Sequence, residues 1–271
     1  MSARGRIPAL LALAVPTLSG IAWMAANGAP SHYPLVNLGA LLLACGWIAL
    51  GKGPNSPKVG YALTALLIAL MLAPLLTGPD LTSVTGNRVS RWIPLLPLTL
   101  NTGMLAVPGL AVLAARHSQL AAPILLAGIF AALLQPDCAT GIALTFAAVG
   151  LHHVNRDWKV GAAAIAGFLA SIAMALRGEL TPQPFVERVL VDATQANALT
   201  ALGLVAALVF AFVLIARAIP AGNGERLALA GTLFGFSVVG VMSNYPSALI
   251  GYGAAPILGF GFALGLYRKS A

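Results

Sequence analysis

The chain has 271 residues, a mean hydropathy of +0.91 and only 8% charged residues. This is too little polar surface to cover a soluble globule of that size, so the composition excludes a soluble protein. Apolar stretches long enough to cross about 30 Å of hydrocarbon recur along the whole chain, which predicts one integral membrane domain over residues 1–271.

The apolar runs are long and do not alternate with polar residues, which predicts an all-α, polytopic membrane protein. We expect about ten transmembrane helices at 7–26, 35–50, 59–77, 95–115, 119–134, 138–153, 160–176, 196–217, 226–243 and 247–267. The first run follows Arg4 and Arg6 in the manner of a signal peptide. We interpret it as a retained helix, because its removal would disturb the charge pattern described next.

The runs 119–134 and 138–153 are short, so they are either two helices or one longer helix. The placement of Lys and Arg separates these alternatives, because cytoplasmic loops retain basic residues. With ten helices and a cytoplasmic N-terminus, 11 of the 15 basic residues lie inside, whereas fusing the two runs gives about 7 inside and 8 outside. The sequence therefore predicts two separate helices, ten in all, with both termini in the cytoplasm.

The formal charge of +8 is explained by these cytoplasmic loops, which face anionic lipid headgroups. Membrane lipid is thus an expected partner and nucleic acid is not. The two cysteines, Cys45 and Cys138, have no CxxC or Cys/His spacing, so we expect neither a metal site nor a cofactor.

Two polar interruptions each allow a structural and a functional interpretation. The outer loop 85–94 brings Arg88, Arg91 and Trp92 to the start of the fourth helix, either as an interfacial anchor or as an anion site. The turn at 134–140 contains Asp137, which either caps the following helix near Thr140 or serves as a functional carboxylate at membrane depth.

Two further interruptions lie nearer the C-terminus. The loop 177–192 is the richest in acids, so it is either a solvated connection or the source of a general base. The segment 244–256 opens the last helix with small residues and two prolines, which favours close helix packing or an unwound stretch that lines a cavity.

Three of these interruptions, in this order, resemble the SEDS family (shape, elongation, division and sporulation), the RodA/FtsW type of bacterial cell-wall polymerase. Gly86 to Ile93 is similar to the family's RWI/RWL signature before the fourth helix, and Gln135, Pro136, Asp137 and Thr140 resemble its QPDxGT turn. Pro246 through Tyr252 and Gly253 resembles its P-x-x-x-V-S-Y-G-G-S opening of the tenth helix. The resemblance covers about 85–267 and implies a multi-pass protein of the bacterial inner membrane, in which these turn residues line a cavity.

The family joins lipid-linked disaccharide peptides, a reaction that needs a base and cations for the departing undecaprenyl pyrophosphate. The resemblance implies Arg88, Arg91 and Arg188 as the cations. It also aligns Glu187 with an aspartate in the family's P-E-x-H-T-D segment, which makes Glu187 the candidate catalytic base, with Glu179 and Asp192 as alternatives.

The chain departs from the family where catalysis is concerned. Asn101-Thr102-Gly103-Met104 replaces the family's Gln-Pro-Ser-Glu, and the short loop before the eighth helix lacks the Asp-Pro motif that carries the family's catalytic aspartate. The sequence therefore leaves peptidoglycan glycosyltransferase activity open and favours its loss.

Our leading hypothesis is a shortened, divergent SEDS-type protein of peptidoglycan assembly, cell shape or division. It would bind an undecaprenyl-linked precursor, or a partner such as a single-span transpeptidase. One alternative is a small permease or lipid transporter. Another is a structural subunit of a larger membrane complex, held by small-residue faces such as Gly261 and Gly265.

Overall fold

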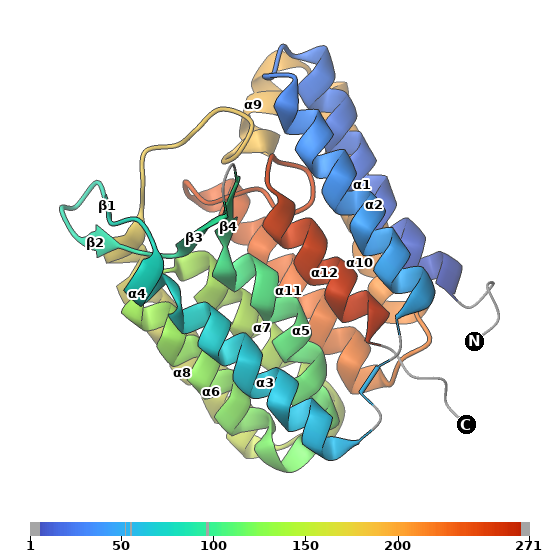
Figure 1. Ribbon diagram of the computed structural model, residues 1–271, viewed down its shortest axis with the longest axis vertical. Helices are drawn as coiled ribbons and strands as arrows, with labels where there is room; N and C mark the ends of the chain where they lie inside the picture. The colour runs from blue at the N-terminus through green and yellow to red at the C-terminus, as the bar shows by residue number, and fades with distance from the viewer. Residues whose placement is uncertain (1–5, 52, 55, 96–97, 267–271) are drawn as a thin grey trace.

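The computed structural model describes residues 6–51, 53–54, 56–95 and 98–266, and it is a bundle of helices (Figure 1). The helices of 12 residues or more within these ranges are α1 (Ile7–Ala26), α2 (His32–Leu50), α3 (Pro57–Leu72), α5 (Thr102–Arg116), α6 (Ala121–Leu134), α7 (Cys138–Asn155), α8 (Trp158–Gly178), α10 (Ala198–Arg217), α11 (Asn223–Met242) and α12 (Ala254–Gly265). The shorter elements are α4 (Pro74–Thr77), the 3-10 helix η2 (Ser118–Leu120), α9 (Val189–Ala196) and the strands β1 (Leu81–Thr82), β2 (Arg88–Val89), β3 (Trp92–Leu95) and β4 (Leu98–Asn101). The predicted all-α membrane class is confirmed.

Six helical segments in the described ranges are long and apolar enough to cross a membrane: α1, α2, α3 with α4, α8, α10 and α11. The helices α5 and α6 are bent by 120° at η2, and α12 is a shorter apolar helix. The runs 119–134 and 138–153 form separate helices, α6 and α7, as predicted. A total of ten membrane crossings stays a prediction.

Two of the predicted helix boundaries are wrong, and both errors fall at polar interruptions. The fourth helix begins at Thr102 instead of residue 95, because Trp92–Leu95 and Leu98–Asn101 pair as an antiparallel β-hairpin. The last helix begins at Ala254 instead of residue 247, because the preceding segment stays non-helical, with positive φ angles at Leu249 and Gly253. In both places a segment that was expected to be part of a membrane-spanning helix instead lies in the non-helical region at one end of the bundle.

The loops gather at two ends of the bundle (Figure 1). At the first, which we call the terminal end, the guanidinium of Arg6 donates to the Ile48 carbonyl (2.5 Å) and that of Arg116 donates to the Leu266 carbonyl (2.9 Å). Arg6 also donates to the Gly51 carbonyl (3.2 Å), and Gly51 packs against the Gly265 carbonyl, so the start of α1 and the end of α12 lie at the same end of the bundle, as the predicted topology requires. The other end, the hairpin end, consists of residues 78–95, 98–101, 135–137, 179–188 and 243–253.

Small residues allow the helices to approach closely. A Cβ added to Gly231 or Gly235 of α11 would overlap the backbone of α7, so these two helices pack backbone against backbone. Gly261 and Gly265 of α12 face Ala44 and Trp47 of α2. The small-residue face that was considered as a docking surface for a partner is thus occupied within the chain.

Candidate functional site

Four segments that are far apart in the sequence meet at the hairpin end: the β-strand region before α5, the turn 135–137, and the loops 179–188 and 243–253. Loop 179–188 is joined to loop 243–253 by Ser247 N, which donates to the Val186 carbonyl (2.9 Å), and Ser247 Oγ accepts from the amide of Val189 at the start of α9 (3.1 Å). The Glu179 carboxylate also accepts from Ser243 Oγ (2.9 Å) and the Asn244 amide (3.2 Å). Because these bonds cross between the two loops, the region is fixed by tertiary contacts instead of by helix ends alone.

Arg91 lies in a closed cage and is only 1% exposed. Its guanidinium stacks over the rings of Trp92 (4.8 Å) and Tyr245 (4.6 Å), and its Nη2 donates to the Gly178 carbonyl (2.7 Å). Its Nη1 lies 3.5 Å from Asp137 Oδ1, which is an ion pair without a hydrogen bond. Burial raises the pKa of the Tyr245 hydroxyl to about 12, so this ring stays neutral beside the cation.

Asp137 balances the charge of Arg91 and caps α7. Its Oδ1 accepts from the Thr140 amide (3.2 Å), and its Oδ2 accepts from the Thr140 hydroxyl (2.8 Å). The neighbouring Gln135 donates to the Met71 carbonyl at the end of α3, and the Pro136 carbonyl packs against Gly178. The predicted capping interpretation is therefore confirmed, and the 135–140 turn is a structural junction between α3, α7 and α8.

Glu187 is 9% exposed and lies beside this cage, next to Pro246 in an isolated antiparallel bridge. Its Oε2 accepts from the Gln183 amide at 2.7 Å. Burial raises the pKa of the Glu187 carboxyl to about 7, although the hydrogen bond from Gln183 and the nearby Arg91 partly oppose this shift. A carboxyl with a pKa near neutrality can either hold or accept a proton at physiological pH.

A cavity of about 270 Å³ opens beside Glu187. Its lining is mixed: the aromatic residues Trp92 and Tyr252, neutral polar groups, prolines and a few aliphatic side chains. The neutral polar lining residues are Thr99, Asn101, Thr181 and Gln183. Glu187 is the one acid among the described lining residues, and none of them is Arg or Lys. We call this space the outer cavity.

Tyr252 and Gly253 form part of the wall of the outer cavity. The Tyr252 amide donates to the Phe185 carbonyl at 2.7 Å, and its ring stacks on Tyr33 with centroids 3.7 Å apart. Gly253 has a φ angle of +150°, a conformation that favours glycine. Of the two interpretations of this segment, the unwound stretch that lines a cavity is the one seen in the structure.

The remaining predicted cations lie outside this centre. Arg88 is exposed on β2 and pairs with the exposed Asp80 at 2.6 Å. Arg188 is exposed at the start of α9, and it does not line the outer cavity. Arg91 is near the cavity but buried behind its wall. A role for these three arginines in binding pyrophosphate stays a prediction.

The comparison with solved structures identifies the fold of the chain. The crystal structure of the Rod shape determining protein RodA of Thermus thermophilus matches over 95% of this chain and 93% of that chain, with a TM-score of 0.65 and 19% sequence identity. The protein has a RodA-type fold. The resemblance predicted from three motifs is confirmed at the level of the fold, including the first three helices, which the motifs did not cover. No protein-family model matches the chain, and no curated protein matches it.

Sequence reasoning missed part of what holds this site together. Tyr245 was noticed only as part of a small-residue stretch, yet its ring covers the Arg91 guanidinium. Asn37 of α2 was not singled out, although it bonds both Gly251 and Gly253. A lone carboxamide within an apolar helix was the available signal, because such a group needs a partner at membrane depth.

In the described ranges no three His, Cys, Asp or Glu side chains lie close enough to hold a metal ion.

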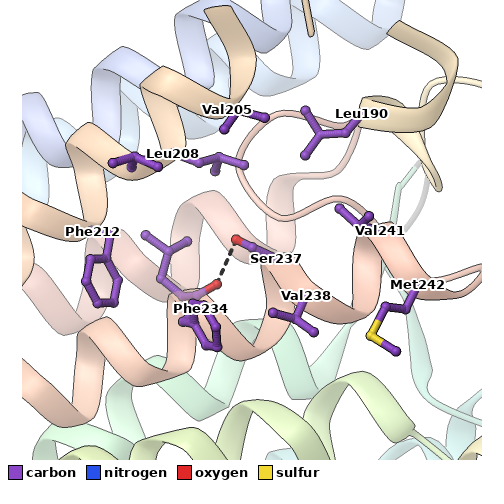
Figure 2. Close-up of a pocket in the computed structure, with 11 residues that line it drawn as sticks. Leu190, Val205, Leu208, Phe212, Phe234, Ser237, Val238, Val241 and Met242 are labelled. Carbon is purple, nitrogen blue, oxygen red and sulfur yellow. Dashed lines mark hydrogen bonds between the residues drawn. The ribbon is translucent and has the colours of Figure 1, made fainter. Parts of the chain in front are cut away.

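A second and larger cavity, of about 520 Å³, lies between α10 and α11 below α9 (Figure 2). Val205, Leu208 and Phe212 line it from α10, and Phe234 and Val241 line it from α11. The hydroxyl of Ser237, in the same wall, already donates to the Leu233 carbonyl within α11 at 2.8 Å. Among the described residues that line this apolar space, none offers a free polar group for acid–base chemistry.

Proposed function

We propose that the protein is a SEDS-type membrane protein of bacterial cell-envelope assembly that binds the sugar end of a lipid-linked peptidoglycan precursor and does not polymerise it. The observation that carries this proposal is the outer cavity, with its two aromatic residues, four neutral polar residues and single carboxyl group. A sugar ring combines apolar faces with a rim of hydroxyl groups, and this lining offers both kinds of contact. The RodA-type fold supports the envelope role.

The same lining argues against polymerisation. Transfer of a sugar from a pyrophosphate carrier needs a base and cationic stabilisation of the leaving group. Glu187 has the pKa of a possible base, but the described lining holds no Arg or Lys, and Arg91 is occupied by Asp137 and two aromatic rings. The base is therefore present without an accessible cation beside it.

The resemblance also implies a protein partner, such as a single-span transpeptidase, and we include this partner class in the proposal. Co-purification of such a protein with the full chain from bacterial membranes tests it. Recovery of unrelated membrane subunits instead would favour the structural-subunit alternative.

The test of the main proposal uses the full chain in lipid nanodiscs with a fluorescent undecaprenyl-pyrophosphate disaccharide pentapeptide. We expect saturable binding and no glycan polymer on gels. Glu187→Gln, which keeps the shape of the side chain, should retain most of the binding, and Glu187→Ala should weaken it. Asp192→Asn is the matched control, because this half-buried acid on α9 does not line the outer cavity.

Two outcomes would overturn the proposal in different ways. Polymer that forms with the wild type and disappears with Glu187→Ala would show an active polymerase. Binding that does not saturate, or that responds to Asp192→Asn as strongly as to Glu187→Ala, would remove the outer cavity as the binding site.

A further inference from the structure

Asn37 is a fully buried carboxamide in the otherwise apolar helix α2. An unpaired amide at membrane depth is costly, so such a group is expected to have strong partners. Its partners are the backbone of loop 243–253, more than 200 residues further along the chain.

The two hydrogen bonds of Asn37 bracket a single residue. Its Nδ2 donates to the Gly251 carbonyl (2.9 Å), and its Oδ1 accepts from the Gly253 amide (3.0 Å). The residue between these two glycines is Tyr252, which lines the outer cavity. We call this pair of bonds the Asn37 clasp.

A second residue of α2 acts on the same tyrosine. Tyr33 lies one helical turn before Asn37, on the same face of the helix. Its ring is stacked on that of Tyr252, with centroids 3.7 Å apart and planes inclined by 5°. Helix α2 therefore holds Tyr252 in two ways: Asn37 bonds to the backbone on either side of it, and Tyr33 stacks on its ring.

The two residues that flank Tyr252 are glycines at positions that disfavour any larger residue. A Cβ at Gly251 would meet the Val186 carbonyl oxygen at 2.7 Å, and Gly253 has a φ angle of +150°, which L side chains rarely adopt. The clasp thus holds a tyrosine between two glycines, Gly251 restricted by the space around it and Gly253 by its backbone conformation.

We propose that Asn37 is a positioning residue that holds the Tyr252 ring as a wall of the outer cavity, so that α2 sets the affinity of the cavity for its ligand. The identity of that ligand, a lipid-linked sugar, rests on the function proposed above. The geometry of the clasp does not, and the two are tested separately.

The first experiment needs no ligand. The full chain is labelled with 3-fluorotyrosine, and ¹⁹F NMR spectra are recorded in nanodiscs, with Tyr252→Phe identifying the signal of Tyr252 among the five tyrosines. Asn37→Leu has the same number and branching of side-chain heavy atoms as Asn but cannot form the two hydrogen bonds, and we expect it to shift and broaden the Tyr252 signal. Thr17→Val is the control, because the buried Thr17 hydroxyl bonds only to Leu13 of its own helix.

An unchanged Tyr252 signal in Asn37→Leu would overturn the inference. Tyr33→Leu provides a second variant should Asn37→Leu misfold, since it removes the stacked ring while leaving the clasp. It too should move the Tyr252 signal, and no movement in this variant would equally contradict the proposal.

The second experiment is a double-mutant cycle on precursor binding. We expect Asn37→Leu to weaken binding by about tenfold, the size of effect that loss of one or two buried hydrogen bonds produces. In a Tyr252→Ala background the same substitution should cause no further loss, because Asn37 acts only through that ring. An equal loss in both backgrounds would overturn the positioning role. Failure of the wild type to bind precursor would overturn the proposed function alone, and the ¹⁹F spectra would still decide the positioning.

Discussion

Asp137 has two roles that substitution can separate, since it caps α7 through the Thr140 amide and balances the buried charge of Arg91. Loss of an N-cap costs about 1 kcal/mol. Leaving a buried cation without its counter-ion costs about 3–5 kcal/mol, and the 3.5 Å separation without a hydrogen bond favours the lower value. We therefore expect Asp137→Ala to lower the free energy of unfolding by about 4 kcal/mol.

Asp157 is the matched control. It caps α8 through the Lys159 amide (2.9 Å), and it forms no salt bridge with the described part of the chain. Asp157→Ala should thus cost only about 1 kcal/mol, and Asp137→Asn, which keeps a capping oxygen, should fall between the two alanine variants. Unfolding in mixed micelles with increasing SDS, followed by circular dichroism, measures all three. Equal losses for Asp137→Ala and Asp157→Ala would refute a stabilising buried ion pair.

Two further predictions concern the same end of the bundle. Burial raises the pKa of the Glu187 carboxyl from 4.5 to about 7, so between these pH values the folded protein retains a proton that the unfolded chain releases. The stability that this protonated carboxyl contributes is therefore complete below about pH 4.5 and is lost as pH rises through about 7. The unfolding temperature of the wild type relative to Glu187→Gln should fall over that window, and a constant difference would contradict the shift. Gly178→Ala should cost about 1–3 kcal/mol, because its Cβ would overlap the Pro136 carbonyl. Gly203→Ala in α10, which meets nothing within 4 Å, should instead stabilise by about 0.5–1 kcal/mol; equal effects in the SDS titration would argue against the close approach at Gly178.

The parts of the fold that were predictable from the sequence depend on local signals. Hydrophobic runs located the long helices, and the cap by Asp137 follows from its place directly before α7. The predicted start of the fourth helix was wrong because Trp92–Leu95 is apolar enough to continue a membrane helix. Only its pairing with Leu98–Asn101 makes it a strand. Pro94 was the available signal, since proline removes a hydrogen bond within a helix and fits readily at the edge of a two-stranded hairpin, but α1 and α5 also contain prolines, Pro16 and Pro108.

The site itself was less predictable, because its contacts join segments that are remote in the sequence. Arg91, Asp137 and Glu187 come from three separate motif-like segments, and the fold brings them together at the hairpin end. The motifs did not indicate that Arg91 is buried, because this depends on the Gly178 carbonyl at the end of α8 and on the ring of Tyr245. Asn37 could be suspected as a lone amide, but its partners could be known only from the packing of α2 against α12 and the loop before it.

The motif residues divide into two groups with different consequences for function. Arg91, Asp137 and Thr140 are buried and bond to one another or to backbone, so they hold α7, α8 and the hairpin end together. A second group of motif residues, Trp92, Tyr252 and Gly253, lines the outer cavity, and the rest of that lining includes residues outside the motifs, such as Asn101 and Thr181. A chain can therefore keep the motifs because the fold needs them, while its cavity changes. This is why the motif match predicted the RodA-type fold correctly, whereas activity must be judged from the cavity lining.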